Sequence, residues 1–319
     1  MIVTLTLNPS LDRTVEVPGL VRGEVIRASA GRLDPGGKGV NVARALLANG
    51  VAARAVLPAG GAVGRQLVEL LEAEGVAMTA VPITGATRSN LTLSEPDGTV
   101  TKINEGGELL GPDEIDLLAD AAMELVGPLD WVVLSSSLPT GVDAGVYARM
   151  TERFRAAGIE VAVDTSGPAL VRAVRAHPTI VKPNRDELSE ALGRDITSFA
   201  DAIAAAEVLR AAGAGSVLAS VGPDGAVLVD RDGVVFGDCA VDEPRSTVGA
   251  GDCLLAGFLA VRSSGASRHE ALATALLWAA AAVELPGSAV PAPADIAGHR
   301  HRPRLTEEVD RLRALTRSG

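Results

Sequence analysis

Two kinds of apolar segment alternate along much of this chain. The first kind is short and rich in β-branched residues, and the second is longer and rich in alanine. Runs that are apolar throughout fit strands buried on both faces, and the stretches between them fit the helices that cover those faces. The alternation predicts an α/β fold in which helices flank a mostly parallel central sheet. The strand-like runs include Ile2–Leu7, Trp131–Leu134, Glu160–Val163 and Ser216–Ser220, and the helix-like stretches include Val40–Ala48, Gln66–Glu74, Asp113–Val126, Ala144–Ala156 and Phe199–Ala212.

Two stretches, Arg13–Arg32 and Arg88–Asn104, break this rhythm. The first alternates polar and apolar residues between turn signals, and the second reads as a hairpin that turns at Pro96-Asp97-Gly98. Strands of this kind have one polar face, so they belong outside a sheet that is buried on both sides. We therefore expect one domain over residues 1–319 with a small β-sheet lid built from residues 13–32 and 88–104.

The composition excludes several classes of protein. The 319 residues include 29 Lys and Arg against 40 Asp and Glu, a formal charge of −11, which argues against nucleic-acid binding. The longest apolar run, Ala271–Val283, is too short to span a bilayer, and Cys239 and Cys253 make no disulfide framework. We expect a cytoplasmic protein that binds neither nucleic acid nor membrane. The Arg-rich stretch His299–Arg317 is interpreted as a solvated terminal helix.

The strongest chemical signal is the segment Ser246–Asp252, which reads Ser-Thr-Val-Gly-Ala-Gly-Asp before the amphipathic run Cys253–Val261. Small residues that lead into a helix leave its first backbone N–H groups open to an anion. Asp252 falls in the first turn, where its carboxylate could accept a hydroxyl proton while the amides hold a phosphoryl group. The alternative is that Thr247 or Asp252 simply caps the helix.

A second glycine-rich segment, Pro35–Ala43, also enters a helix. Gly36 and Gly37 permit close backbone approach, while Lys38 and Asn41 can bond an oxygen-rich ligand. The segment lacks the spacing of a phosphate-binding Walker loop, and no buried strand precedes it as a dinucleotide fingerprint requires. Taken alone, it could also be an ordinary glycine turn with one exposed lysine.

Two further segments follow predicted strands. Lys182-Pro183-Asn184 comes after the run Thr179–Val181, and Asn184 and Glu187 lie three residues apart, where they could hold the water shell of Mg²⁺ or form a helix cap. Asp12 lies beyond the first strand, at the edge where open α/β sheets bind ligands, and could bind sugar hydroxyls or close a turn.

Lysine and asparagine are rare and unevenly placed. The chain has 26 Arg but only three Lys, and all three lie in or beside the candidate segments, as do five of the six Asn. Because a compact ammonium differs chemically from a planar guanidinium, this placement supports a cationic ligand site at these segments. The three lysines are Lys38, Lys102 and Lys182, and the five asparagines are Asn8, Asn41, Asn90, Asn104 and Asn184.

Together, the two glycine motifs, their order and the intervening Lys182–Glu187 segment resemble the ribokinase-like, or pfkB, family of carbohydrate kinases. The resemblance runs from Thr4 to about Pro291. Thr6–Asp12 and Thr87–Asn90 are similar to the phosphosugar branch, especially to kinases of fructose 1-phosphate. The resemblance implies a three-layer α/β core of about nine strands with a β lid. It also implies transfer of the γ-phosphoryl group of ATP to the C6 hydroxyl of fructose 1-phosphate, with Mg²⁺ as cofactor.

The resemblance also implies roles for individual residues. Asp252 would be the base, and Gly249, Ala250 and Gly251 would form the anion hole. The nucleotide and its Mg²⁺ would be served by Lys182, Asn184, Glu187, Ser220, Gly222, Gly225, Thr247 and Gly249, with Asn184 and Glu187 reaching the metal through water. The sugar would be bound by Asp12, Gly36, Gly37, Asn41 and Asn90, and its phosphate by Lys38, Arg88 and Lys102.

Several alternatives stay open. The same scaffold could phosphorylate tagatose 6-phosphate or fructose 6-phosphate, because one sequence does not fix which end of a ketose is presented. A sugar-phosphate sensor would need no base or metal group, and a dinucleotide oxidoreductase would need a glycine fingerprint after the first strand. A lid with one apolar face would favour a homodimer in which two lids pair.

Overall fold

A ten-stranded sheet runs through the body of the protein, of which the computed structural model describes residues 1–308. In spatial order its strands are β14 (Arg304–Thr306), β13 (Gly233–Asp238), β12 (Ala226–Asp230), β11 (Ser216–Ser220), β10 (Ile180–Val181), β9 (Glu160–Asp164), β8 (Trp131–Ser135), β1 (Ile2–Leu5), β4 (Ala53–Ala59) and β5 (Met78–Pro82). Neighbouring strands from β5 to β11 run parallel, and β12, β13 and β14 extend the sheet antiparallel.

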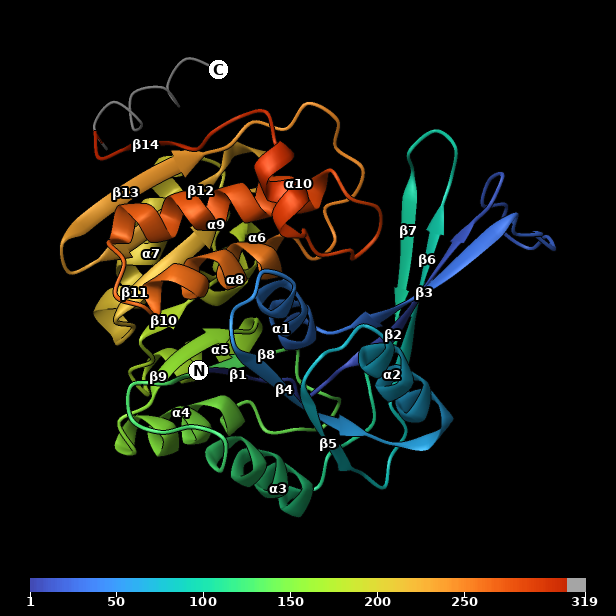
Figure 1. Cartoon of the computed structure of the whole chain (residues 1–319), viewed down its shortest axis with the longest axis horizontal. Helices are drawn as coiled ribbons and strands as arrows, with labels where there is room; N and C mark the ends of the chain where they lie inside the picture. The colour runs from blue at the N-terminus through green and yellow to red at the C-terminus, as the bar shows by residue number, and fades with distance from the viewer. Residues whose placement is uncertain (309–319) are drawn as a thin grey trace.

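Helices cover both faces of this sheet, as Figure 1 shows. In β1, Val3 and Leu5 pack on one side and Ile2 on the other, which explains why this strand is apolar throughout. One layer contains α1 (Lys38–Ala48), α2 (Gly61–Ala73), α8 (Ala250–Arg262), α9 (Arg268–Val283) and α10 (Pro293–Gly298); the other contains α3 (Pro112–Met123), α4 (Val146–Ala156), α5 (Gly167–Val174), α6 (Arg185–Leu192) and α7 (Phe199–Ala212). The predicted three-layer fold is confirmed.

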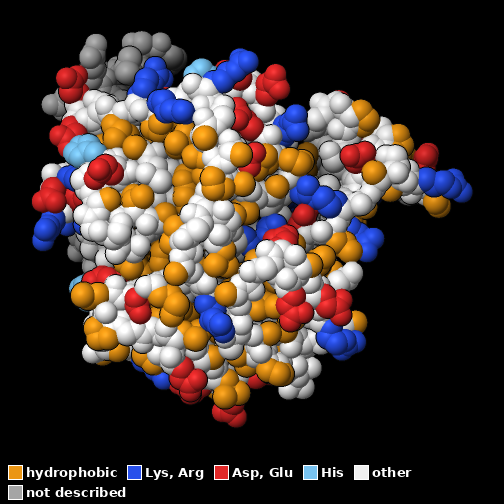
Figure 2. All heavy atoms as spheres, in the orientation of Figure 1, with side chains coloured by type: hydrophobic (Ala, Val, Ile, Leu, Met, Phe, Trp, Pro, Cys, Tyr) orange, Lys and Arg blue, Asp and Glu red, His pale blue; other side chains and the backbone are white. Residues whose placement is uncertain are grey.

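A separate four-stranded sheet forms the lid, in the order β3 (Ala30–Gly36), β2 (Ser10–Glu16), β6 (Arg88–Ser94) and β7 (Val100–Asn104). It projects from the body in Figure 1 and stands out as an arm in Figure 2. The small sheet predicted from the two irregular stretches is therefore present. Its first two strands reach further than expected, since the β2–β3 ladder continues to the pair Ser10 and Gly36.

Two expectations need correction. The core sheet has ten strands in the described part of the chain rather than about nine, because β14 adds to the edge. That strand also replaces part of the terminal helix expected over His299–Arg317; the residues of this stretch beyond 308 lie outside the described structure. No helix within residues 1–308 is long and apolar enough to cross a membrane.

Candidate active site

The candidate site lies where parallel strands end and two helices begin. Asp164 is the last residue of β9, and Lys182 directly follows β10. The start of α1 brings Lys38 and Asn41 to this edge, and the start of α8 brings Asp252. Side chains that are far apart in the sequence thus meet at one edge, as expected for an open α/β sheet.

The start of α8 forms an anion-binding corner. Gly249 is the N-cap residue with φ 78°, a left-handed conformation that glycine adopts without strain, and Ala250 opens the helix. A Cβ at Gly251 would lie 3.4 Å from Lys182 Nζ, so the ammonium of Lys182 lies beside the first turn. Because the N-cap is a glycine, the alternative in which Thr247 caps this helix does not apply. Open N–H groups and an ammonium together favour a bound phosphate.

Asp252 occupies the first turn of α8 and is only 7% exposed. Its Oδ2 accepts a hydrogen bond from Asn41 Nδ2 over 2.8 Å. Burial and the nearby charge of Asp164 raise the pKa of Asp252 to about 7, although Asn41, Lys182 and Lys38 act in the opposite direction. A carboxyl group with this pKa can accept a proton near neutral pH, which is the property that a general base requires.

Next to this base lies a cluster of carboxylates and lysines. Lys38 Nζ donates to Asp164 Oδ1 over 2.8 Å and to Glu187 Oε1 over 2.6 Å. Lys182 Nζ lies 3.3 Å from Asp164 Oδ2, a buried oxygen that accepts no hydrogen bond from the described residues. Burial lowers the pKa of Lys38, but the charges of Asp164 and Glu187 outweigh this effect and raise the pKa above its ordinary value.

Lys38 makes contacts that the sequence interpretation did not include. Lys38 was expected beside Arg88 and Lys102, around the phosphate of the sugar, yet its two bonds tie it to β9 and α6. The reason is that Gly37 is the N-cap of α1, so that Lys38 opens the helix and reaches Asp164 and Glu187. Lys38 therefore contacts Glu187, one of the residues that the sequence interpretation assigns to the nucleotide.

Asn184 and Glu187 form a reciprocal cap at the start of α6. Asn184 Oδ1 accepts from the backbone N–H of Glu187 over 2.8 Å, and Glu187 Oε2 accepts from that of Asn184 over 2.9 Å. The capping alternative is thus present, but carboxylate oxygens have capacity to accept further bonds from metal-bound water. The pair fits a role in the outer shell of Mg²⁺. Residues 1–308 contain no cluster of three or more His, Cys, Asp or Glu side chains suited to direct ligation.

The other predicted nucleotide residues follow β11. Ser220 and Asn184 form an isolated parallel β-bridge. The backbone N–H of Ser220 donates to Pro183 O over 3.0 Å. Gly222 and Gly225 bound the short 3₁₀ turn Gly222–Asp224 that leads into β12. This turn lies next to α6, because Arg185 bonds Asp224 across the two segments. The structure therefore brings the predicted nucleotide segments together.

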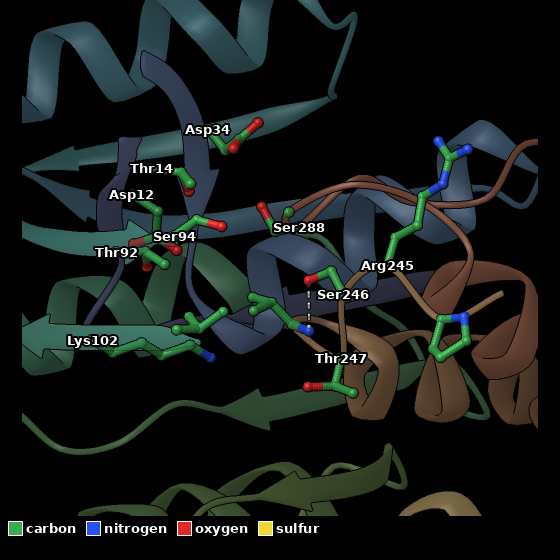
Figure 3. A pocket seen from close by; sticks show the side chains of 14 residues that line it. Asp12, Thr14, Asp34, Thr92, Ser94, Lys102, Arg245, Ser246, Thr247 and Ser288 are labelled. Carbon is green, nitrogen blue, oxygen red and sulfur yellow. Dashed lines mark hydrogen bonds between the residues drawn. The ribbon is translucent and has the colours of Figure 1, made fainter. Parts of the chain in front are cut away.

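A cavity of about 380 Å³ separates the lid from the body. In Figure 3, Thr92 and Lys102 extend from the lid on one side, while Ser246 and Thr247 lie on the other. Of the three cations expected around the sugar phosphate, only Lys102 lines this cavity. The lining residues are Asp12, Thr14, Asp34, Thr92, Ser94, Val100, Lys102, Pro244, Arg245, Ser246, Thr247, Val248, Gly287 and Ser288.

Asp12 and Asn90 form a polar group on the cavity side of the lid. Asp12 Oδ1 accepts from Asn90 Nδ2 over 2.8 Å and from Ser10 Oγ over 2.7 Å. A Cβ at Gly36 would lie 2.4 Å from Asp12 Oδ2, so this glycine makes room for the carboxylate. Asn90 Oδ1 is buried and has no hydrogen-bond partner among the described residues, which leaves an acceptor for a ligand hydroxyl.

Arg88 ties the base of the lid to the body. Its guanidinium donates to Asn8 O over 3.1 Å and to Glu105 O over 2.8 Å. Burial lowers the pKa of Arg88, although Asp12 and Glu105 act in the opposite direction. The structure thus places Arg88 beside the polar group of Asp12, outside the set of residues that line the cavity.

Sequence reasoning missed several residues of this site. Asp164 follows the predicted strand Glu160–Val163, and the rule that selected Lys182 and Asp12, a polar residue at a strand end, would also have found it. Ser246 belongs to a segment that was selected, although it was given no role. Thr14, Thr92 and Ser94 carry no comparable signal, because their place at the cavity depends on the register of the lid strands.

A buried carboxylate beside an anion-binding helix start, with lysines nearby and a lid across the cavity, is the arrangement of a small-molecule kinase. The chain belongs to the pfkB family of carbohydrate kinases, whose family model matches residues 5–295. This confirms the family resemblance found in the sequence.

Individual relatives cover nearly the whole chain. It is 39% identical to the 1-phosphofructokinase of Rhodobacter capsulatus over 300 residues, which are 93% of this chain and 94% of the relative. It is 36% identical to the ATP-dependent 6-phosphofructokinase isozyme 2 of Escherichia coli over 272 residues, 84% and 88% of the two chains. Phosphofructokinase-2 from Escherichia coli, solved with substrates and products, superposes with a TM-score of 0.88 at 33% identity, covering 93% and 97% of the two chains.

Proposed function

We propose that this protein is an ATP-dependent 1-phosphofructokinase, which transfers the γ-phosphoryl group of ATP to the C6 hydroxyl of fructose 1-phosphate. The observation that carries the proposal is the burial of Asp252 in the first turn of α8, because it brings a base of suitable pKa beside the anion corner of Gly249 and Lys182. The choice of sugar rests on relatives named 1-phosphofructokinase at 34–39% identity, among them those of Rhodobacter capsulatus and Haloferax volcanii.

In this mechanism Asp252 takes the proton of the attacking hydroxyl, and the amides of Gly249, Ala250 and Gly251 hold the phosphoryl group in transfer. Lys182 adds positive charge beside those amides, where charge develops. Mg²⁺ would neutralise the nucleotide phosphates, with its water shell held by Asn184 and Glu187. We assign Lys38 to the nucleotide side as well, because it bonds Glu187.

The sugar phosphate would lie in the cavity under the lid. Asp12 and Asn90 offer acceptors for its hydroxyl groups, and Lys102 supplies positive charge for the phosphate that the sugar already carries. A sugar without a phosphate would not need this cation.

A coupled ADP-release assay tests the proposal, with fructose 1-phosphate, fructose 6-phosphate and tagatose 6-phosphate compared side by side and unphosphorylated fructose as the control. We expect the highest kcat/KM with fructose 1-phosphate and little turnover of fructose. A higher kcat/KM with either 6-phosphate would replace the assignment by the corresponding kinase. ADP release without a sugar, or with none of them, would argue against a sugar-phosphate kinase.

We further propose that two copies pair through the outer face of the lid. The lid residues that line the cavity include Asp12, Thr14 and Thr92. The residues that alternate with them along the strands face away from the cavity. This outer face carries five apolar side chains around the exposed Arg13, and one of them, Ile103, is 55% exposed. Light scattering should give a dimer mass, and Ile103→Lys should shift it toward the monomer; a monomeric wild type would contradict the proposal. The apolar residues of this face are Val15, Leu33, Leu91, Leu93 and Ile103.

We also propose that the enzyme works in the cytoplasm, where ATP and sugar phosphates are available. Both of its cysteines, Cys239 and Cys253, are free thiols, which agrees with a reducing compartment. Fractionation of the cells that produce the protein would test this location.

A further inference from the structure

Arg44 connects the surface of the molecule to the candidate base. It lies on α1 one turn after Asn41 and is 6% exposed. Its guanidinium forms two hydrogen bonds with Glu74, which follows α2. Nε donates to Oε2 over 2.6 Å, and Nη2 donates to Oε1 over 2.9 Å. The remaining nitrogen, Nη1, donates to Asn41 Oδ1 over 3.3 Å and to Ser288 O over 3.0 Å.

These contacts fix the direction of the Asn41 amide. A guanidinium can only donate hydrogen bonds, so the group of Asn41 that faces Arg44 must be its oxygen. The NH₂ group of Asn41 then points the other way, to Asp252 Oδ2. Without Arg44, the amide could rotate and present its oxygen to Asp252. A carbonyl oxygen favours a protonated carboxyl partner, because only the protonated group can donate to it.

The burial of Arg44 argues for such a task. Most of α1 around it is packed with apolar side chains, and a hydrophobic residue would fill that space without the cost of burying a charge. The same nitrogen, Nη1, also donates to the backbone oxygen of Ser288, which lines the cavity under the lid. One side chain thus links the base and the cavity wall.

We propose that Arg44 is a positioning residue that orients the Asn41 side chain, so that an N–H group and never a carbonyl faces the Asp252 carboxylate. This inference rests on the proposed function only in taking Asp252 as the base. It assigns Arg44 no contact with substrate, and the effect of Arg44 on the base runs through Asn41.

The charges around Asp252 define what the variant should change. Asp164 from β9 favours the protonated form of Asp252, whereas Lys182 after β10, Lys38 on α1 and the N–H group of Asn41 favour the ionised form. Arg44→Met leaves Asp164, Lys182 and Lys38 in place. It frees Asn41 and also removes the bonds to Glu74 and Ser288, which are not among the groups that act on the pKa of Asp252. The pKa of Asp252 should therefore rise in this variant.

The test is the dependence of log kcat/KM on pH. The acid limb of this profile is the fall of kcat/KM at low pH, where Asp252 becomes protonated. In Arg44→Met, the limb should lie about one pH unit higher. The value of kcat/KM should then be about tenfold lower than in the wild type below the limb and close to the wild-type value above it. Arg44→Lys keeps the charge but lacks the planar guanidinium, so its acid limb should shift in the same direction. This variant replaces Arg44→Met in the test if Arg44→Met folds poorly. Arg54→Met, which removes an arginine bonded to β5, is the matched control and should leave the limb in place. An equal loss of kcat/KM at every pH would overturn the proposal.

A double-mutant comparison tests whether Arg44 acts on Asp252 through Asn41. If Arg44 acts through Asn41, then Arg44→Met should add no further shift of the limb in an Asn41→Ala background. An equal shift in both backgrounds would mean a direct charge effect and would overturn the proposal.

A second readout needs no activity. It compares the free energy of unfolding of the protein that has Asp252 with that of its Asp252→Asn variant. The first value minus the second should fall as pH rises through the pKa of folded Asp252. In an Arg44→Met background this fall should end about one pH unit higher, and an unchanged end point would overturn the proposal. If the wild type transfers no phosphoryl group but this shift occurs, the proposed function fails while the role of Arg44 stands.

Discussion

Lys38 Nζ donates to Glu187 Oε1 over 2.6 Å and so joins the glycine-rich start of α1 to the first turn of α6. The two segments are 149 residues apart in the sequence. One was expected to serve the sugar and the other the nucleotide. Their contact is an ion pair that joins the start of α1 to the cap of α6.

Lys38→Met should weaken nucleotide binding. Its raised pKa keeps Lys38 charged at neutral pH, and that stabilising contribution would be lost only as pH rises through the folded pKa, above its ordinary value. Removal leaves buried Asp164 with Lys182 as its nearest cation, so the free energy of unfolding should fall by about 3 kcal/mol. Initial rates should show a KM for ATP raised about tenfold or more. A raised KM for the sugar phosphate alone would restore the original assignment of Lys38.

Lys102→Met should have the opposite pattern. Because this lysine lines the cavity under the lid, its loss should raise the KM for the sugar phosphate about tenfold and leave that for ATP unchanged. Lys102→Arg is the control, since it keeps the charge and should retain most of the affinity. Equal KM values for the sugar phosphate in Lys102→Met and wild type would remove Lys102 from the site.

Asp252→Asn should abolish most turnover with little effect on binding. The amide keeps the shape of the side chain but cannot take a proton, and loss of a positioned base typically costs about 10²–10⁴-fold in kcat. Rapid-quench measurement of turnover and calorimetric titration with the sugar phosphate separate the two effects. Turnover within tenfold of wild type would reject Asp252 as the base.

The pH profile of the wild type should reflect the same residue. Asp252 must be ionised to accept a proton, and burial raises its pKa to about 7. We therefore expect kcat/KM to fall tenfold for each pH unit below about 7, as the base becomes protonated. A profile that stays flat down to pH 5 would show that the reacting base has an unshifted pKa.

Residues close in sequence to a strand end or helix start were predictable. Asn184 and Glu187 stand three residues apart after a strand, and the structure has them at the start of α6, where they cap the helix. Asp252 was predicted because the run of small residues before it indicates the start of a helix. In each case the signal and the chemistry lie within one turn of chain.

Pairings between distant segments were not predictable. The sequence places Lys38 in a glycine motif, but whether it reaches the lid or β9 depends on how α1 packs against the sheet. The contact of Asn41 with Asp252 likewise joins residues 211 positions apart. Arg44 has no motif of its own, and its role follows only from the three groups that its guanidinium meets.

The four lid strands are all attached to the body at the same end. Ser10, Gly36 and Arg88 pair across this end, and Asn104 pairs with Asn90 close to it. Further out, Arg32 beside Thr14 donates to Pro286 O of the body over 2.9 Å, so the lid is held at a second point. Displacement of the sheet should therefore grow only beyond this second point. Asp12 and Thr14 would then hold a ligand in a nearly constant position, whereas Ser94 further out would follow ligands of different length.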